Sequence, residues 1–286
     1  MTNRLVASHW TIAGATPNDP ARFPFESRIR TTAETGFWGI GMQVDDYVQT
    51  RERGRSDSEM LRLLESTGMV VDEIEFHIGW SSDIESIRAR AFLTEASLFA
   101  AADALGVRQL NVGCGELPHE VASVERLAER FAALCERASA HNLTVALEFL
   151  PWSGIPDIAT ASEVVRQAAA PNGGILLDTW HFFRGNPDFD ALRAIPADRI
   201  VGVQVNDGPA QPVGEIRDET RHGRSLPGEG DFDLARVVRE LDAMGVSAPW
   251  AIEVMSDDLT TKELRAACRL AFDSTTSMLE KARSDV

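Results

Sequence analysis

Four oxygen-bearing side chains end four short apolar runs in the second half of the sequence: Glu148, Asp178, Gln204 and Glu253. Barrels of parallel strands carry their catalytic groups at the carboxyl ends of the strands. Side chains alternate along a strand, so all four are predicted to face one mouth of a barrel. Three buried carboxylates that close together would repel one another unless a cation compensated them. The pattern therefore predicts a divalent metal ion held by these four residues.

The donor set favours one kind of metal and one kind of chemistry. Oxygen ligands without histidine or thiolate favour Mn²⁺, with Mg²⁺ and Co²⁺ as alternatives. A metal that chelates a carbonyl and a neighbouring hydroxyl stabilises the enolate formed when a proton leaves the α-carbon, and a carboxylate of the set can be the base. Returning the proton gives epimerisation or isomerisation, whereas loss of a β-hydroxyl gives dehydration. His181 could donate a proton to that hydroxyl, or simply pack at the strand end.

Several further residues are candidates for binding substrate. His77 ends a predicted strand, and its alternation with Glu75 predicts that both line the pocket. Trp10 and Trp152 fall near predicted strand mouths and could form apolar walls against a sugar or cyclic ring face. Tryptophan is mostly buried in any protein, so each of the two could instead belong to the core.

The longest stretch without clear periodicity runs from Asp207 to Asp231 and is rich in proline and glycine. Loops of this length are usually functional or disordered. On the catalytic face of a barrel we expect a lid, in which Arg221 and Arg224 could hold hydroxyls, a carboxylate or a phosphate. The alternative is a solvated loop with scattered charge.

The elements that must position these residues form a repeated pattern of apolar runs and amphipathic stretches, typical of βα units. The predicted strands are residues 5–11, 38–43, 70–78, 109–113, 144–150, 174–178, 200–206 and 249–254. The predicted helices include 84–105, 120–141, 158–169, 233–244 and a last helix at 261–283. With 286 residues, about the size of one α/β barrel, we predict a (β/α)8 TIM barrel forming a single domain over residues 1–286. The last helix closes the barrel or packs on a partner subunit, which leaves a homo-oligomer open.

Composition excludes several classes of protein. A net charge of −16 disfavours binding to nucleic acid. Three separated cysteines without a CxxC pair indicate neither a disulfide framework nor a thiolate zinc site, which fits the reducing cytoplasm. No apolar segment has the length of a signal peptide core or a membrane span. The lysines, Lys262 and Lys281, both lie in the last predicted helix, so a Schiff-base mechanism is not expected. We expect a soluble protein with a small ligand.

An ordered set of short motifs resembles the xylose-isomerase-like TIM barrels, the sugar phosphate isomerase/epimerase superfamily. The motifs are Leu147-Glu148-Phe149, Leu177-Asp178-Thr179-Trp180-His181, Val203-Gln204-Val205-Asn206-Asp207, Pro227-Gly228-Glu229-Gly230 and Ile252-Glu253-Val254. By this resemblance Glu148, Asp178, Gln204 and Glu253 would bind the metal. Glu148 and Glu253 would also exchange protons with a substrate carbon, and His181 would contact a substrate oxygen.

The chain departs from the ketose 3-epimerases of this superfamily at two points. Those enzymes usually carry histidine where this chain has Gln204, and a further glutamate where this chain has Pro151-Trp152-Ser153-Gly154. The Gln204 pattern resembles the 3-dehydroshikimate dehydratase branch more closely.

Two enzymatic functions therefore compete. The first is isomerisation or epimerisation of a keto-sugar or keto-polyol in carbohydrate metabolism. The second is dehydration or β-elimination by a metal-dependent lyase, acting on a 3-keto cyclic polyol, a keto-glycoside or a dehydroshikimate-like acid. The superfamily also includes a DNA-repair endonuclease with three zinc ions, but six histidines and the acidic charge argue against that activity. A barrel that only binds a ligand would predict a degraded metal cage, whereas all four oxygen ligands are present.

Overall fold

A computed structural model describes residues 4–17, 19–115 and 123–284. Within these residues eight parallel strands close a barrel in sequence order, with β8 paired to β1. The strands are β1 (Leu5–Ala7), β2 (Gly39–Gln43), β3 (Val70–His77), β4 (Gln109–Gly113), β5 (Thr144–Glu148), β6 (Gly173–Asp178), β7 (Ile200–Val205) and β8 (Trp250–Ile252). Nearly every strand residue is buried, as expected where helices cover a parallel sheet. The predicted (β/α)8 barrel is confirmed.

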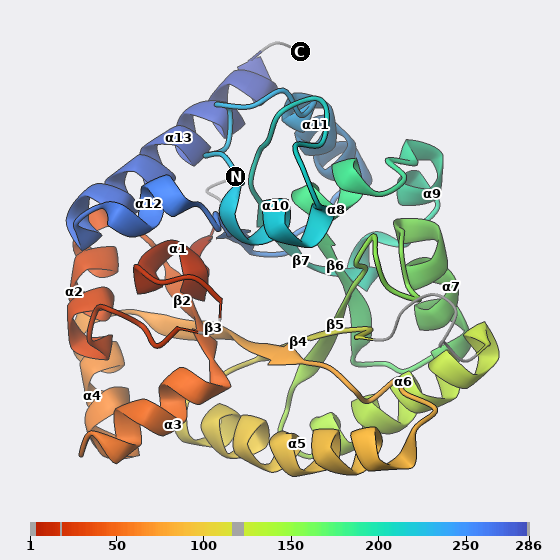
Figure 1. Cartoon of the computed structure of the whole chain (residues 1–286), viewed down its shortest axis with the longest axis horizontal. Helices are drawn as coiled ribbons and strands as arrows, with labels where there is room; N and C mark the ends of the chain where they lie inside the picture. The colour runs from red at the N-terminus through yellow and green to blue at the C-terminus, as the bar shows by residue number, and fades with distance from the viewer. Residues whose placement is uncertain (1–3, 18, 116–122, 285–286) are drawn as a thin grey trace.

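Helices surround the barrel, as Figure 1 shows. They are α1 (His9–Ala13), α2 (Phe25–Thr35), α3 (Val44–Glu52), α4 (Asp57–Thr67), α5 (Glu85–Leu105), α6 (Val124–Ser139), α7 (Ile158–Ala168), α8 (Thr179–Arg184), α9 (Phe189–Arg193), α10 (Ile216–His222), α11 (Leu234–Met244), α12 (Asp257–Thr261) and α13 (Leu264–Ser284), with a 3₁₀ turn at Ala197–Arg199. In α6 the apolar residues Leu127, Phe131 and Leu134 recur at helical spacing and are buried. No helix among the described residues is long and apolar enough to cross a membrane.

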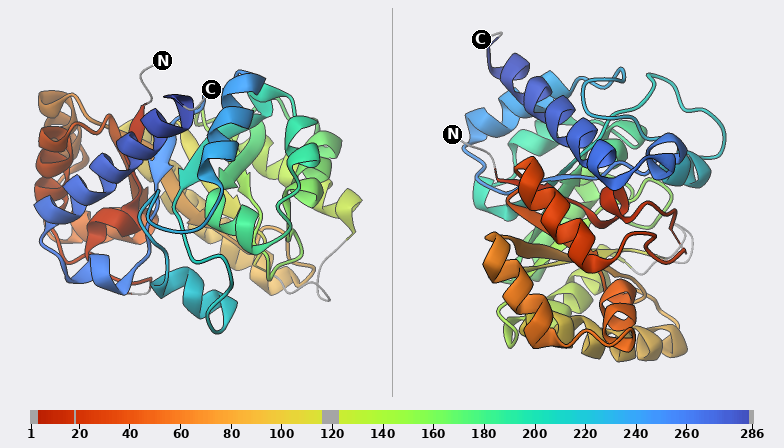
Figure 2. Two further views of the ribbon diagram at one scale, coloured as in Figure 1. Left: turned by 90° about the horizontal axis from the view of Figure 1, so that it is seen from above. Right: turned by 90° about the vertical axis from the view of Figure 1, so that its left-hand side faces the viewer.

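Several predicted boundaries were wrong. The strand predicted at 5–11 ends at Ala7, because α1 begins at His9. The last predicted helix, 261–283, corresponds to α13 and begins three residues later than predicted, because Lys262, which follows α12, is extended. The first residues of the helix predicted at 120–141 lie outside the described residues. The segment 207–231, predicted as a loop, contains α10, which projects from one end of the barrel in the left view of Figure 2.

Polar side chains cross the interior of the barrel where glycine makes room for them. A Cβ atom at Gly41 would lie 2.7 Å from Glu73 Oε1, and one at Gly202 would lie 2.7 Å from Gln109 Nε2. The amide groups form a chain in which Gln109 donates to Asn111 at 2.9 Å and Asn111 donates to Glu73 at 2.8 Å. The floor beneath the mouth is therefore polar and acidic, with burial raising the pKa of Glu73 to about 8.

Candidate active site

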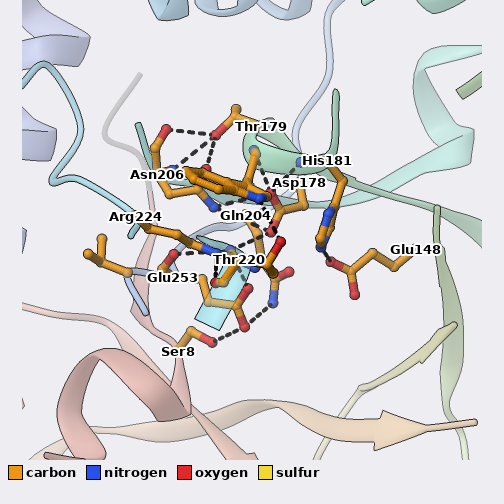
Figure 3. A network of polar contacts seen from close by, with 12 residues as sticks. Ser8, Glu148, Asp178, Thr179, His181, Gln204, Asn206, Thr220, Arg224 and Glu253 are labelled. Atoms are coloured by element: carbon orange, nitrogen blue, oxygen red, sulfur yellow. Dashed lines mark hydrogen bonds and ion pairs between the residues drawn. The ribbon is translucent and has the colours of Figure 1, made fainter. Parts of the chain in front are cut away.

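The four side chains singled out in the sequence come from four adjacent strands. Glu148 and Asp178 are the last residues of β5 and β6, Gln204 lies near the end of β7, and Glu253 directly follows β8. Register pairs Asp178 with Gln204 across β6 and β7. All four are at most 5% exposed, and Figure 3 shows them around one small region. The fold thus brings them together at the carboxyl ends of the strands.

Asp178 is held in place by the start of a helix. Its Oδ1 accepts hydrogen bonds from the backbone nitrogens of Trp180 at 2.6 Å and His181 at 3.2 Å, so it is the N-cap of α8. The amide of Asn206 donates to both carboxylate oxygens, at 3.1 and 3.3 Å. The same carboxylate therefore starts α8 and faces the mouth.

Arg224 lies between two of these carboxylates. Its Nη1 donates to Asp178 Oδ2 at 2.9 Å and to Glu253 Oε2 at 2.8 Å, and its Nε donates to the carbonyl of Thr220 at 3.1 Å. The side chain is 2% exposed. Burial opposes ionisation of Asp178, but the Arg224 charge, together with His181 and the hydrogen bond from Asn206, holds the pKa of Asp178 below its usual value. The predicted lid arginine is thus buried among the carboxylates.

His181 and Glu148 form a second buried pair. His181 Nε2 is 3.3 Å from Glu148 Oε1, and the Trp152 ring packs edge-on against the imidazole with its centroid 5.3 Å away. Burial lowers the pKa of His181 to about 4, while burial and the charge of Asp178 raise the pKa of Glu148 well above its usual value. At neutral pH the imidazole of this pair is therefore neutral, and burial favours the protonated form of Glu148.

Glu253 joins the mouth to the interior of the barrel. Its Oε1 lies 3.5 Å from Gln204 Nε2 and 3.3 Å from Ser8 Oγ, and Ser8 Oγ is also 3.3 Å from Glu75 Oε1. Burial raises the pKa of Glu253 to about 8, although Arg224 opposes the shift. Among the described residues, the buried Gln204 Oε1 and His181 Nδ1 have no hydrogen-bond partner.

These observations fit a metal ion. Ligand atoms of Glu148, Asp178 and His181 lie within 4.8 Å of one another. Burial and the neighbouring carboxylates raise the pKa values of Glu148 and Glu253 although Arg224 opposes both shifts, and Gln204 offers an oxygen with no partner among the described residues. The buried Glu/Asp/His cluster could therefore bind a metal, with Gln204 and Glu253 beside it. This cluster brings in His181, which the sequence pattern placed outside the ligand set.

One predicted substrate-binding residue, His77, lies away from the mouth. His77 Nε2 is 3.3 Å from Glu95 Oε1 of α5, and Glu95 is bound in turn by Arg137 of α6. Ile74 pairs with Leu110 and His77 pairs with Val112, so β3 has one more residue than β4 between these two pairs. This extra residue reverses the alternation of side chains along β3, and His77 points to the opposite side of the sheet from the predicted one. The prediction that His77 faces the pocket was therefore wrong. Arg221 is exposed on α10.

The two predicted aromatic walls lie on different sides of the mouth. Trp152 contacts His181, and the guanidinium of Arg217 lies 6.0 Å from the Trp152 ring centroid. Trp10 is half-buried on α1, beside Gln43 at the end of β2. With the Gln43 amide oriented to satisfy both of its ends, its oxygen accepts from Trp10 Nε1 at 3.3 Å.

Asp207 organises the segment that carries Arg224, a role that the sequence pattern did not reveal. Its Oδ1 accepts from the backbone nitrogens of Gly208 at 2.8 Å and Phe232 at 3.0 Å, and its Oδ2 accepts from Gly228 at 3.0 Å. An antiparallel bridge also joins Asp207 to Ser225, the residue after Arg224. The proline- and glycine-rich stretch is therefore bound to the end of β7. The Pro227-Gly228-Glu229-Gly230 motif was the available signal.

Comparison with known proteins agrees with this architecture. The xylose isomerase-like TIM barrel family matches residues 29–272. A 3-dehydroshikimate dehydratase of Pseudomonas aeruginosa is 30% identical over 158 residues, which are 55% of this chain and 25% of that protein. An inosose isomerase of Halalkalibacterium halodurans is 27% identical over 150 residues, 52% of each chain. The chain thus spans about a quarter and about half of these relatives.

The solved structures show the same fold. A crystal structure of the IOLI protein with a bound zinc atom superposes with a TM-score of 0.87, covering 98% of this chain and 99% of that one at 16% identity. The predicted superfamily is confirmed: the chain belongs to the xylose isomerase-like TIM-barrel family.

Proposed function

We propose that this protein is a divalent-metal-dependent enzyme that removes a proton from the carbon next to a carbonyl group of a keto-sugar or keto-polyol, giving isomerisation or epimerisation. One observation carries the proposal: Glu148, Asp178 and Glu253 are buried together at the barrel mouth beside the unpartnered Gln204 Oε1. Burying carboxyl groups without full compensation is costly, which a role in binding and proton transfer explains.

The same residues divide into holding and reacting groups. Glu148, Asp178, Gln204 and Glu253 would hold the ion, with Mn²⁺ favoured by the predominance of oxygen donors. When bound, the ion would polarise the substrate carbonyl and acidify the neighbouring C–H group. Glu148 and Glu253 would exchange the proton. Their pKa values are raised, to about 8 for Glu253, which brings a carboxylate closer to the basicity that this step requires.

Arg224 and His181 would orient the substrate. Both carboxylate contacts of Arg224 are made by Nη1, and Nη2 has no hydrogen-bond partner among the described residues. It can therefore donate to a substrate oxygen. His181 is neutral, and its imidazole can donate to a substrate oxygen or to a departing hydroxyl. Trp152, edge-on to His181, would contact the ring face of the substrate.

A metal-dependent dehydratase or β-elimination lyase is the second candidate. Gln204 is the third of the four proposed metal ligands in sequence order, the position at which ketose 3-epimerases usually carry histidine. His181, next to Glu148, could protonate a leaving hydroxyl group. Identity of 30% to a 3-dehydroshikimate dehydratase over 55% of the chain also favours it. The small neutral keto-polyol and the dehydroshikimate-like acid are therefore both reasonable probes.

One experiment tests both functions. The protein would be incubated with Mn²⁺ in deuterated water with either an inosose or 3-dehydroshikimate, and followed by proton NMR and ultraviolet absorption. Isomerisation or epimerisation should incorporate deuterium without a new absorbing product, whereas dehydration should form a conjugated, absorbing one.

The matched variants are Glu253→Gln in the mouth and Glu95→Gln outside the barrel. The first should lose activity and the second should keep it if folded. Exchange that persists in Glu253→Gln would contradict the role of that carboxylate, and no reaction of wild type with any keto-polyol or keto acid would contradict the enolising enzyme.

A further inference from the structure

A hollow of about 630 Å³ lies at the carboxyl ends of β1 and β2, beside the candidate active site. It is lined by His9 and Trp10 of α1, Gln43 at the end of β2, and α3 residues including Asp45 and Gln49. Ser8, whose hydroxyl contacts Glu253, directly precedes His9. Glu253 follows β8, and β8 pairs with β1, so the hollow and the proposed base lie at neighbouring strands of the same mouth. The volume of the hollow is in the usual range for small-molecule sites.

His9, which lines this hollow, has a ring nitrogen that contacts no acceptor among the described residues. Its Nδ1 is 3.5 Å from both Arg28 Nη1 and the backbone nitrogen of Gln43. Both neighbours can only donate, so Nδ1 accepts and the ring hydrogen lies on Nε2. Within the described part of the chain Nε2 has no hydrogen-bond partner, and it is not among the buried atoms that lack one, so it reaches solvent. His9 Nε2 is therefore a donor that a ligand oxygen can accept from.

The walls of the hollow suit a sugar. Trp10 stands edge-on to His9, with ring centroids 4.7 Å apart, and its indole N–H is fixed by Gln43. It offers an aromatic surface against which the C–H groups of a sugar ring can pack. Gln49 and the exposed Asp45 supply polar atoms at the rim, where hydroxyl groups can donate and accept.

The charge of the lining narrows the choice of ligand. Asp46 is neutralised by the buried Arg28. The remaining charged groups are acidic Asp19, Asp45 and Glu52 against Arg53. Acidic groups in excess repel phosphate and carboxylate.

We propose that this hollow binds a neutral sugar unit that extends from the part of the substrate reacting at Glu148 and Glu253. The substrate class is then a keto-glycoside or a similarly extended polyol, an assignment that rests on the proposed function for the reacting part. His9 Nε2 donates to a hydroxyl or ring oxygen of this unit, Trp10 packs on its face, and Asp45 accepts from its hydroxyls.

Binding measured without turnover tests the site. Calorimetric titration of wild type would use glucose, cellobiose, maltose and glucose 6-phosphate. We expect at least one disaccharide to bind about tenfold more tightly than glucose, the scale of one or two added hydrogen bonds and a ring contact, and glucose 6-phosphate to bind no more tightly than glucose. Trp10→Leu and Asp45→Ala should each reduce the preference for disaccharide, while Trp38→Leu, before β2 at the opposite end of the barrel, should not.

The result that overturns the proposal is a wild type that binds neither disaccharide more tightly than glucose, or a preference that persists undiminished in both Trp10→Leu and Asp45→Ala. The disaccharide preference is expected to survive in Glu253→Gln. A preserved preference with no deuterium exchange in any keto substrate would refute the proposed function and leave the sugar site standing. Deuterium exchange into a keto substrate without a preference for disaccharide would support the proposed function and refute the sugar site.

Discussion

Replacing Arg224 by glutamine removes the positive charge between Asp178 and Glu253, and we expect it to destabilise the protein most when no divalent ion is supplied. Arg224 Nη1 contacts both carboxylates within 2.9 Å, and the side chain is 2% exposed, so water screens the interaction poorly. Removing one partner of a buried ion pair costs about 3–5 kcal/mol. Protonation of a carboxyl group relieves part of this cost, so we expect about 3 kcal/mol at pH 7. This corresponds to a fall in Tm of about 6 °C in a chain of this size.

The loss should depend on pH with a definite sign. Arg224 lowers the pKa of Asp178 in the folded protein, so the pair contributes stability above the unfolded pKa of 3.8 that is lost as pH falls through the folded pKa. In Arg224→Gln the pKa of Asp178 rises and this contribution disappears. The difference in free energy of unfolding between wild type and variant should therefore be larger at pH 7 than at pH 3.

Thermal unfolding with and without Mn²⁺ measures the effect. A bound ion would supply the missing charge, so saturating Mn²⁺ should raise the Tm of Arg224→Gln more than that of wild type. Arg221→Gln, an exposed arginine nearby on α10, is the matched control and should change stability by no more than about 0.5 kcal/mol. An equal loss of Tm with and without Mn²⁺, or no loss at all, would refute the idea that Arg224 supplies charge that an ion can replace.

Three further predictions concern protons, the loop and catalysis. The pKa of Glu253 is raised to about 8 and that of Glu148 is also raised, so Mn²⁺ binding should release protons. The Kd for Mn²⁺, measured by calorimetry, should then fall about tenfold from pH 6 to pH 7 for each proton released. A Kd independent of pH would contradict this. Asp207→Asn puts an amide N–H against backbone N–H groups, and denaturant unfolding should show a loss of about 1–3 kcal/mol; an unchanged midpoint would show that Asp207 does not anchor the segment. His181→Asn should lower kcat by about 10²–10⁴-fold with little change in the Kd for Mn²⁺, whereas loss of Mn²⁺ binding would make His181 a ligand rather than an acid.

Local pattern was sufficient for the architecture and for much of the candidate site. The apolar runs that end at Glu148 and Asp178 form β5 and β6, because short runs buried on both faces are typical of parallel strands covered by helices. Asp178 could also be recognised as a helix start, since aspartate commonly caps the helix that follows it. Alternation within single strands then placed Gln204 and Glu253 near the same mouth.

The sequence by itself thus determined the order of the strands and which oxygen-bearing side chains end them, because both depend on neighbours along the chain. Only the tertiary structure decided three other matters. An extra residue in β3 turned His77 outward, since alternation fails wherever register shifts. Arg224 enters the mouth because distant Asp207 binds its segment, and the contacts of His9 Nδ1 with Arg28 and Gln43 leave Nε2 as the donor at the hollow. These placements, and the pKa shifts that burial causes, arise from contacts between residues far apart in the chain, which local periodicity does not encode.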